Sequence, residues 1–134
     1  MTTFELVPEG TEVILLVEDE DVFRTYACAY LESEGYHVLA ASNGEDAMEI
    51  CRSYDGPIHV LITDIVMPGM GGTELARAAL KLRPDLAVMF VSGYPDRTLN
   101  IETSDRSTFV QKPFSFDVLN RALRSLLDKN NESE

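Results

Sequence analysis

The segment VILLVEDED at residues 13–21 decides the fold of this chain. Its first five residues are all apolar and rich in β-branched side chains, and the run is too short for a helix. Such a run is typical of a strand buried on both faces, as in a parallel sheet. Four acidic residues follow it at once. The segment therefore predicts a buried parallel strand whose carboxyl end presents carboxylates.

Similar runs and helical patterns alternate along the rest of the chain. Apolar runs recur at residues 38–41, 60–62, 87–91 and, more weakly, 108–110. Apolar side chains spaced by three and four predict helices at residues 22–31, 47–54, 75–82 and 119–127. Strand then helix, repeated about five times with short links, predicts an α/β fold: a doubly wound, five-stranded parallel (βα)5 sheet covered on both faces by right-handed crossovers. Residues 95–107 contain few large aliphatic side chains, so any helix there should be short or irregular.

Length, charge and cysteine content exclude several classes of function. The chain has 134 residues, enough for one domain, and 11 Lys and Arg against 23 Asp and Glu give a net charge of −12. Such a balance argues against binding to nucleic acid or to acidic membranes, because phosphates attract clustered cations. Neither a membrane-spanning run nor a signal peptide is present, so we expect a cytoplasmic protein. Cys28 and Cys51 lie within amphipathic patterns and are expected to be buried free thiols.

Three carboxylates are expected to meet at one edge of the sheet. In open α/β sheets the functional groups lie at the carboxyl ends of the strands. Glu18 and Asp19 follow the first strand and Asp64 ends the third, so they converge if these strands are neighbours. Close carboxylates either share protons or bind a cation, and oxygen ligands without His or Cys favour Mg²⁺. The alternative is that Asp19 only caps a helix and Asp64 only ends a strand.

Two further strand ends favour a chemical role. The fourth strand ends at Ser92-Gly93 and the fifth at Lys112-Pro113-Phe114. A hydroxyl, a lysine and three acids provide a nucleophile, metal ligands, a cation and a hydrogen-bond donor. The sequence therefore predicts a site for phosphoryl chemistry.

Taken together, these residues make the chain resemble the receiver domain of two-component response regulators, a family of CheY-like proteins. The resemblance covers residues 11–127 and rests on four motifs in the family's order: LLVEDE at 15–20, TDIVMPGMGG at 63–72, VSG at 91–93 and KPF at 112–114. It implies a flavodoxin-like strand order of 2-1-3-4-5. The expected organisation is a flexible lead-in at 1–12, a receiver domain at 13–128 and a polar tail at 129–134.

The resemblance also implies a role for each acidic residue. Asp64 would be the phosphoacceptor, taking a phosphoryl group from a histidine of a kinase or phosphotransfer domain. Asp19, Asp64 and the backbone carbonyl of Val66 would hold Mg²⁺, and Glu18 would act through a bound water. Glu18 stands where many members carry Asp. Such a domain is a switch that assists its own phosphorylation and dephosphorylation, and is not an enzyme.

The remaining motif residues would sense and stabilise the phosphoryl group. Ser92 would hydrogen-bond one phosphoryl oxygen, and Lys112 would pair with another. A cis peptide bond between Lys112 and Pro113 would direct the lysine inward. Phe109 matches the switch aromatic, which turns inward when Ser92 moves toward the phosphate.

Two positions are expected to control how long the phosphoryl group lasts. Water must attack in line with the bond that breaks, so side chains beside that path matter. By resemblance these are Val66 and Tyr94. Val66 offers no hydrogen bond and Tyr94 is bulky, so the acyl phosphate should be long-lived.

The resemblance further suggests partners. We expect a monomer or weak dimer whose first helix docks on a four-helix phosphotransfer partner, without direct binding to nucleic acid or membrane. The chain could be a stand-alone regulator or the receiver of a hybrid sensor histidine kinase. Phe23, Tyr26 and Tyr30 lie on one helical stripe and are interpreted as core, and His37 and His59 as non-catalytic.

Three other functions are weighed against this one. A flavodoxin-like carrier would need a Ser/Thr/Gly loop where this chain has four acids. An aspartate-nucleophile phosphatase would place an acid at Val66. A degenerate receiver, acting only as a protein-binding module, would have no use for the full set of Asp19, Asp64, Ser92 and Lys112.

Overall fold

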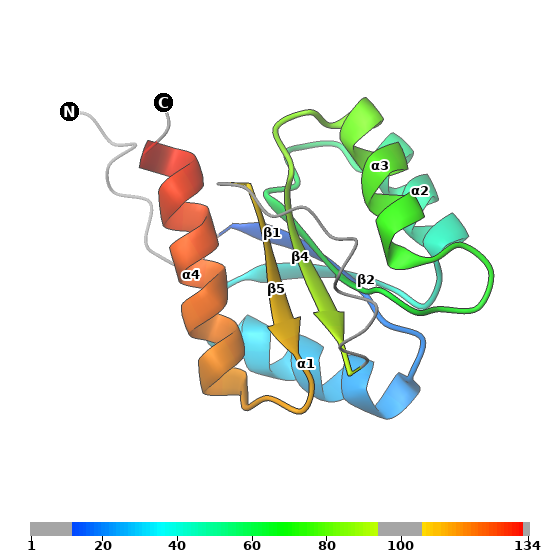
Figure 1. Cartoon of the computed structure of the whole chain (residues 1–134). Helices are drawn as coiled ribbons and strands as arrows, with labels where there is room; N and C mark the ends of the chain where they lie inside the picture. The colour runs from blue at the N-terminus through cyan, green and yellow to red at the C-terminus, as the bar shows by residue number, and fades with distance from the viewer. Residues whose placement is uncertain (1–11, 94–105, 133–134) are drawn as a thin grey trace.

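In the part of the chain that the structure describes, a parallel sheet lies between two pairs of helices (Figure 1). The computed structural model describes residues 12–93 and 106–132, with side chains through residue 128. In this part of the chain the strands are β1 (Val13–Val17), β2 (His37–Ala41), β3 (Val60–Asp64), β4 (Ala87–Ser92) and β5 (Ser107–Gln111). The helices are α1 (Asp21–Ser33), α2 (Gly44–Ser53), α3 (Gly72–Leu82) and α4 (Phe116–Glu132). Helix α4 thus includes the first residues of the segment expected as a polar tail.

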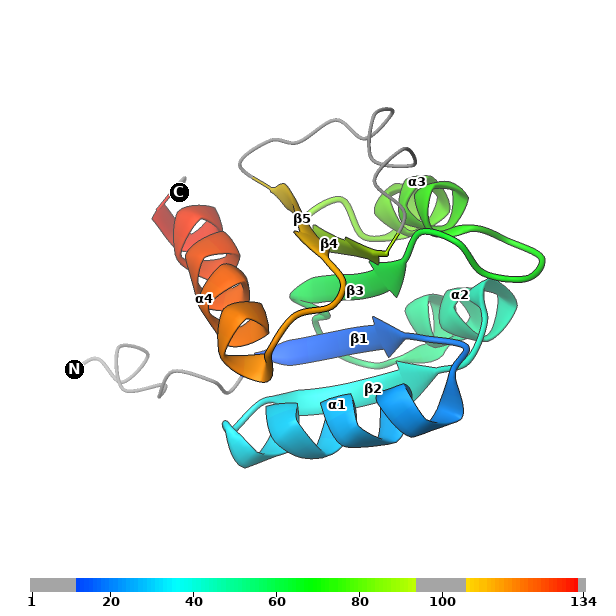
Figure 2. The ribbon, with the colours of Figure 1, turned by 60° about the horizontal axis from the view of Figure 1, so that its bottom comes forward.

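All five strands are parallel and lie in the order β2-β1-β3-β4-β5, which confirms the predicted topology (Figure 2). Helices α1 and α4 cover one face, and α2 and α3 cover the other. A parallel sheet covered on both faces requires strands that are apolar throughout. The helix expected between the fourth and fifth strands falls on residues 94–105, outside the described residues.

Alternate residues of each strand enter opposite cores. Ile14 and Leu16 face α1 and α4, whereas Leu15 and Val17 face α2 and α3, and all four are nearly inaccessible to solvent. Side chains of a strand alternate between its faces, so a buried strand needs both kinds of position to be apolar. The run at residues 13–17 meets that requirement.

Helix α1 differs from its prediction on one side. Ala27 and Leu31 are buried, and Phe23 and Tyr30 are half-buried against the same core. Tyr26 is 64% exposed, so its assignment to the core is wrong. The buried face of the helix is centred on Ala27, and Tyr26, one residue earlier, is turned by about 100° from it toward solvent. The predicted end of the helix is confirmed, because Gly35 adopts a φ of 101° just beyond it.

A polar network, which we call the amino-edge network, ties α4 to the amino ends of the first two strands. The Arg124 guanidinium donates to Glu12 Oε1 (3.0 Å), to Asp128 Oδ1 (3.1 Å) and to the Tyr36 hydroxyl (3.4 Å). Tyr36 in turn donates to Asn120 Oδ1 at 3.2 Å. Tyr36 is buried, so its hydroxyl needs these partners.

Arg83 joins α2 to α3. Its guanidinium donates to the carbonyl oxygens of Cys51 (3.0 Å), Tyr54 (2.7 Å) and Gly56 (2.7 Å). The last carbonyls of a helix have no partner within the helix. Arg83 therefore completes the end of α2 from the end of its neighbour.

Candidate functional site

Three carboxylates gather at the carboxyl ends of β1 and β3. One oxygen from each of Glu18, Asp19 and Asp64 lies within 4.8 Å of the other two. Glu18 is buried, Asp64 is half-buried and Asp19 is exposed. Because β1 and β3 are adjacent, the sheet itself brings these residues together. An all-oxygen set that is partly open to solvent fits a hard divalent cation.

Lys112 reaches this cluster from the end of β5. Its ammonium donates to Glu18 Oε1 at 3.3 Å and to Asp64 Oδ2 at 3.2 Å. The Lys112 backbone N–H also donates to the carbonyl oxygen of Ser92 at 2.8 Å. The peptide bond between Lys112 and Pro113 is cis. We call Glu18, Asp19, Asp64 and Lys112 the carboxyl-edge site.

The charges of this site act on one another. Burial raises the pKa of Glu18, and the hydrogen bond from the Glu20 backbone and the charge of Lys112 only partly offset this effect. Burial opposes the charge of Lys112, but the Asp64 and Glu18 carboxylates raise the pKa of the ammonium above its ordinary value. One ammonium therefore pairs with two of the three clustered carboxyl groups, and negative charge remains in excess at the site.

The turn after β1 fixes the buried carboxylate. The Glu20 backbone N–H donates to Glu18 Oε2 at 3.0 Å. Arg24 donates to the Glu18 carbonyl oxygen at 2.8 Å and pairs with Asp21 Oδ1 at 2.6 Å. Asp19 does not cap α1, since Glu20 holds the N-cap position. Arg24 was not among the predicted site residues, and its only sequence signal is its position three residues after Asp21.

The loop between β3 and α3 is closed against Asp64. The backbone N–H of Gly72 donates to the Ile65 carbonyl oxygen at 2.9 Å, and that of Ile65 donates to Val91 of β4 at 3.0 Å. A Cβ atom on Gly72 would overlap the Asp64 carbonyl oxygen. A glycine is therefore required where the helix begins.

Three of the other predicted residues lie on β4, on β5 and in the loop after β3. Ser92 ends β4 and is fully buried, next to the end of β3. Phe109 is half-buried on β5 and packs against the core beneath α2 and α3. The Val66 side chain is 38% exposed just after Asp64. Tyr94 lies outside the described residues.

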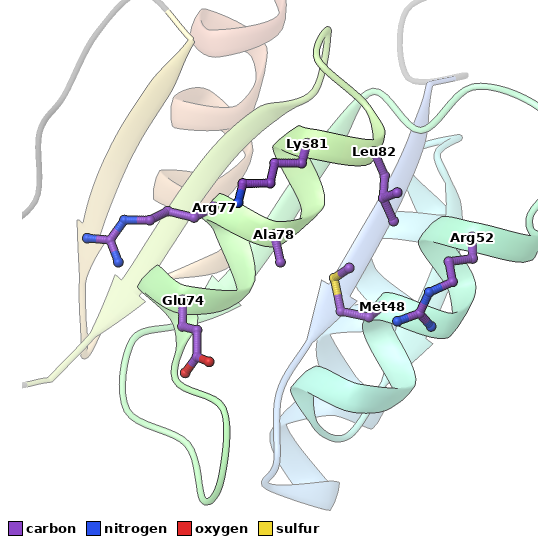
Figure 3. Close-up of a pocket in the computed structure, with 7 residues that line it drawn as sticks. All are labelled: Met48, Arg52, Glu74, Arg77, Ala78, Lys81 and Leu82. Atoms are coloured by element: carbon purple, nitrogen blue, oxygen red, sulfur yellow. The ribbon is translucent and has the colours of Figure 1, made fainter.

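A groove of about 400 Å³ lies elsewhere, between α2 and α3 (Figure 3). Met48, Ala78 and Leu82 lie between the two helices, and the Arg77 side chain points away from α2. Arg52, at its rim, pairs with Glu49 at 3.2 Å. None of the predicted site residues lines this groove. The concave surface and the reactive groups thus occupy different parts of the molecule.

The structure also bears on the predictions for the two cysteines, for His59 and for membrane-spanning segments. Cys28 and Cys51 are free, and burial raises the pKa of each thiol. Cys51 is buried and Cys28 half-buried. His59 Nδ1 accepts a hydrogen bond from the Val13 backbone N–H at 2.9 Å. Among the residues that the structure describes, no helix has both the length and the apolar character needed to cross a membrane.

Comparison with known proteins assigns the chain to a family. The family model described as response regulator receiver domain matches residues 14–124. The chain is 39% identical over 117 residues to the response regulator receiver protein CpdR of Brucella abortus, and the match covers 85% of this chain and 96% of CpdR. It is 37% identical over 122 residues to the sensor kinase CckA of the same organism, covering 90% of this chain but only 13% of the kinase.

Solved structures agree with this assignment. The receiver domain of the hybrid histidine kinase CckA superposes with a TM-score of 0.75 at 38% identity, covering 86% of this chain and 98% of that domain. The response regulator TrrA of Thermotoga maritima, solved in complex with Mg²⁺ and BeF, gives 0.74 at 32% identity, covering 87% of this chain and 99% of TrrA. The fold, the conjunction of carboxylates and lysine, and these matches lead to one conclusion: the chain belongs to the response regulator receiver domain family.

Proposed function

We propose that this domain is a phosphorylation-controlled switch that accepts a phosphoryl group on Asp64 from a phosphohistidine of a kinase or phosphotransfer protein. The observation that carries the proposal is the position of Lys112. Its ammonium lies 3.2 Å from Asp64 Oδ2, where it would stabilise negative charge arriving at that carboxylate. The family match and the acidic cluster support the same role.

The reaction would be a displacement at phosphorus. An Asp64 carboxylate oxygen forms a bond to phosphorus, and the P–N bond to the donor histidine breaks. The electron pair of that bond returns to the imidazole nitrogen, so the imidazole leaves neutral when its other nitrogen carries a proton. Lys112 would then pair with a phosphoryl oxygen, and the Ser92 hydroxyl would donate to another.

Mg²⁺ is the cofactor that we assign to this chemistry. Asp19, Asp64 and the Val66 carbonyl would hold the ion, with Glu18 acting through a bound water. When bound, the ion would neutralise charge shared between the carboxylates and the phosphoryl oxygens. The oxygen-only ligand set supports this assignment, as does the Mg²⁺ complex of TrrA.

The signal would leave the site through Ser92 and Phe109. Ser92 ends β4, which is next to β3, and Phe109 lies on β5, which is next to β4 and is only half-buried at this position. Movement of Ser92 toward the phosphoryl group would open space for the Phe109 ring to turn inward. Phe109 has no hydroxyl, so the two states would differ in packing alone.

The first helix is the docking surface that we assign to the phosphodonor. Val22 and Tyr26 on α1 are 63% and 64% exposed, although both are large and apolar or aromatic. They follow the carboxyl-edge site directly, so a four-helix partner covering them would bring its histidine near Asp64. The domain would act in the cytoplasm as a monomer or weak dimer, and the net charge of −12 disfavours nucleic acid as a direct partner.

Val66 and Tyr94 are assigned the control of phosphoryl lifetime. Val66 is exposed beside Asp64 and offers no hydrogen bond to an attacking water. Replacing Val66→Asn together with Tyr94→Glu should speed the loss of phosphate after desalting about tenfold, since one orienting contact of ~1.4 kcal/mol in the transition state has that effect. Unchanged decay in the double variant would remove both residues from this role.

Phosphorylation by a small donor tests the proposed function. With phosphoramidate or acetyl phosphate and Mg²⁺, intact-mass spectrometry should show one phosphoryl group on the wild type and none on Asp64→Asn, and a chelator should prevent the gain. Equal uptake by Asp64→Asn, or uptake that ignores the chelator, would contradict the assignment. A degenerate receiver acting only as a binding module would take up none.

A further inference from the structure

The ring of Phe23 lies beside the ammonium of Lys112. Lys112 Nζ is 4.9 Å from the centroid of the Phe23 ring, within the range of a cation–π contact. Phe23 belongs to α1, whereas Lys112 follows β5, so the contact joins segments far apart in the chain. The ammonium thus has Glu18 and Asp64 as carboxylate partners and an aromatic face as a third neighbour.

Other aromatic rings fix the position of Phe23. Phe114, two residues after Lys112, meets it edge-on, with ring centroids 5.8 Å apart and an interplanar angle of 82°. The Phe116 ring centroid lies 6.2 Å from that of Phe23, and Phe116 stacks on Tyr30 at 4.9 Å. These contacts link α1 to the start of α4. The Phe23 ring therefore contacts two other rings and cannot turn away without disturbing them.

An aromatic neighbour suits a lysine that must change partners. The Lys112 side chain has four rotatable bonds and is 27% exposed, so its ammonium could otherwise move out into water. The ring attracts the ammonium and excludes water from one side. A phenyl ring carries no strong hydrogen-bonding group, so it does not compete with an incoming phosphoryl oxygen. A leucine would fill much of the same space without this attraction.

We infer that Phe23 is a positioning residue that holds the Lys112 ammonium over Asp64. The inference rests on the proposed phosphoryl acceptance at Asp64. It assigns to a core-facing position of α1 a role in the chemistry of the site. The ring keeps Lys112 at the carboxylates before phosphorylation and near the phosphoryl oxygens afterwards.

The first test compares variants with and without a ring. The initial rate of phosphorylation by phosphoramidate with Mg²⁺, followed by intact mass, should fall about fivefold in Phe23→Leu. Phe23→Tyr keeps the aromatic face and should restore a rate close to that of the wild type. If Phe23→Leu loses secondary structure by circular dichroism, Phe23→Met asks the same question with a flexible side chain. Equal rates in the leucine and tyrosine variants would overturn the inference.

A matched control separates positioning from packing. Tyr30→Leu removes a ring that stacks on Phe116 but has no ring contact with Phe23 and no contact with Lys112 among the described interactions. Its phosphorylation rate should stay near that of the wild type, even if its stability falls. A fivefold loss of rate in Tyr30→Leu as well would mean that the aromatic cluster acts through folding alone, and would overturn the inference.

A second test needs no phosphorylation. Urea unfolding of the wild type, Phe23→Leu, Lys112→Met and the double variant measures the coupling between the two side chains. We expect the unfolding equilibrium constants to show a favourable coupling of about threefold to fivefold. Absence of coupling would overturn the role of Phe23. Coupling without phosphoryl uptake by the wild type would instead contradict the proposed function and leave the contact established.

Discussion

Two groups of charged side chains lie at opposite edges of the same sheet, and they are balanced differently. In the amino-edge network, the Arg124 guanidinium pairs with the carboxylates of Glu12 and Asp128. The neutral hydroxyl of Tyr36 accepts a further hydrogen bond from it. In the carboxyl-edge site, three carboxyl groups lie together and one ammonium pairs with two of them, Glu18 and Asp64. Both contain more acid than base, but only the carboxyl-edge site concentrates its acids around a common centre.

The energies of the two groups differ for that reason. Two ionised carboxylates with oxygens within 4.8 Å of each other repel by at least about 3 kcal/mol at an effective dielectric constant near 20. The Lys112 ammonium offsets part of this repulsion between Glu18 and Asp64, and a divalent cation would offset the rest. The comparison teaches that in the amino-edge network every acid has Arg124 as a partner, whereas the carboxyl-edge site gathers more carboxylates around one centre than its ammonium pairs with.

Removing the central cation of each group should separate their roles most clearly. Lys112→Met should lower the rate of phosphoryl uptake from phosphoramidate about 100-fold, because it removes the group that stabilises the arriving charge. Arg124→Met should leave that rate nearly unchanged under conditions where it is folded. Intact-mass time courses measure both rates. Similar losses in the two variants would remove the functional distinction between the edges.

Arg124 should matter for the stability of the fold rather than for phosphoryl uptake. Arg124→Met leaves Glu12 without its partner and the Tyr36 hydroxyl with fewer bonds, which should lower the free energy of unfolding by about 2 kcal/mol. Arg121→Met, an exposed position on the same helix, should change it by less than about 0.5 kcal/mol. Urea unfolding monitored by circular dichroism makes the comparison. Equal effects at positions 121 and 124 would show that the amino-edge network contributes nothing.

Mg²⁺ should stabilise the protein through the carboxyl-edge site and not through the amino-edge network. At ten times its dissociation constant, the ion should add about 1.4 kcal/mol to the free energy of unfolding and raise Tm by about 4 °C. Asp19→Asn should lose most of that increase, whereas Glu12→Gln at the opposite edge should keep it. Thermal melts with and without chelator provide the measurement. A Tm that ignores millimolar Mg²⁺ would count against the metal site.

The smallest expected effect is a pH dependence. The pKa of Glu18 is raised in the folded protein, so the folded state binds a proton at this residue more readily than the unfolded state does. Without metal, stability should therefore rise as the pH falls through that raised pKa toward the ordinary value of 4.5. Glu18→Gln should lack this part of the profile. Urea midpoints measured between pH 7 and 4.5 in both proteins would reveal the difference, and parallel profiles would contradict it.

The sequence predicts those features that depend on neighbouring residues. The apolar run at 13–17 suffices to predict a strand buried on both faces, and Gly35 suffices to predict the end of α1. The convergence of Glu18, Asp19 and Asp64 also follows once the strands that carry them are taken as neighbours. Each of these inferences needs only a local pattern and the general rule for parallel sheets.

Side-chain contacts that depend on how the helices pack against the sheet were not predicted. Glu12 and Arg124 are separated by 112 positions, and nothing in either neighbourhood indicates the pair. The capping of α2 by Arg83 and the contact between Phe23 and Lys112 likewise depend on how helices are placed against the sheet. Tyr26 shows the same limit, since an apolar stripe does not say which of its edges faces solvent. Side-chain pairing across the fold requires the three-dimensional arrangement.

The glycine at the start of α3 has a consequence for protein engineering. Because Gly72 abuts the Asp64 backbone and bonds to Ile65, the loop between them begins and ends at fixed points on the sheet. A loop whose two ends are fixed can be lengthened or replaced without moving its anchors. Each doubling of its length costs only about 0.6 kcal/mol in closure entropy. New sequences could be inserted near Gly69, at the exposed tip, while both anchors are kept. The surface next to the Asp64 carboxylate could then be redesigned for a new partner without moving Asp64 itself.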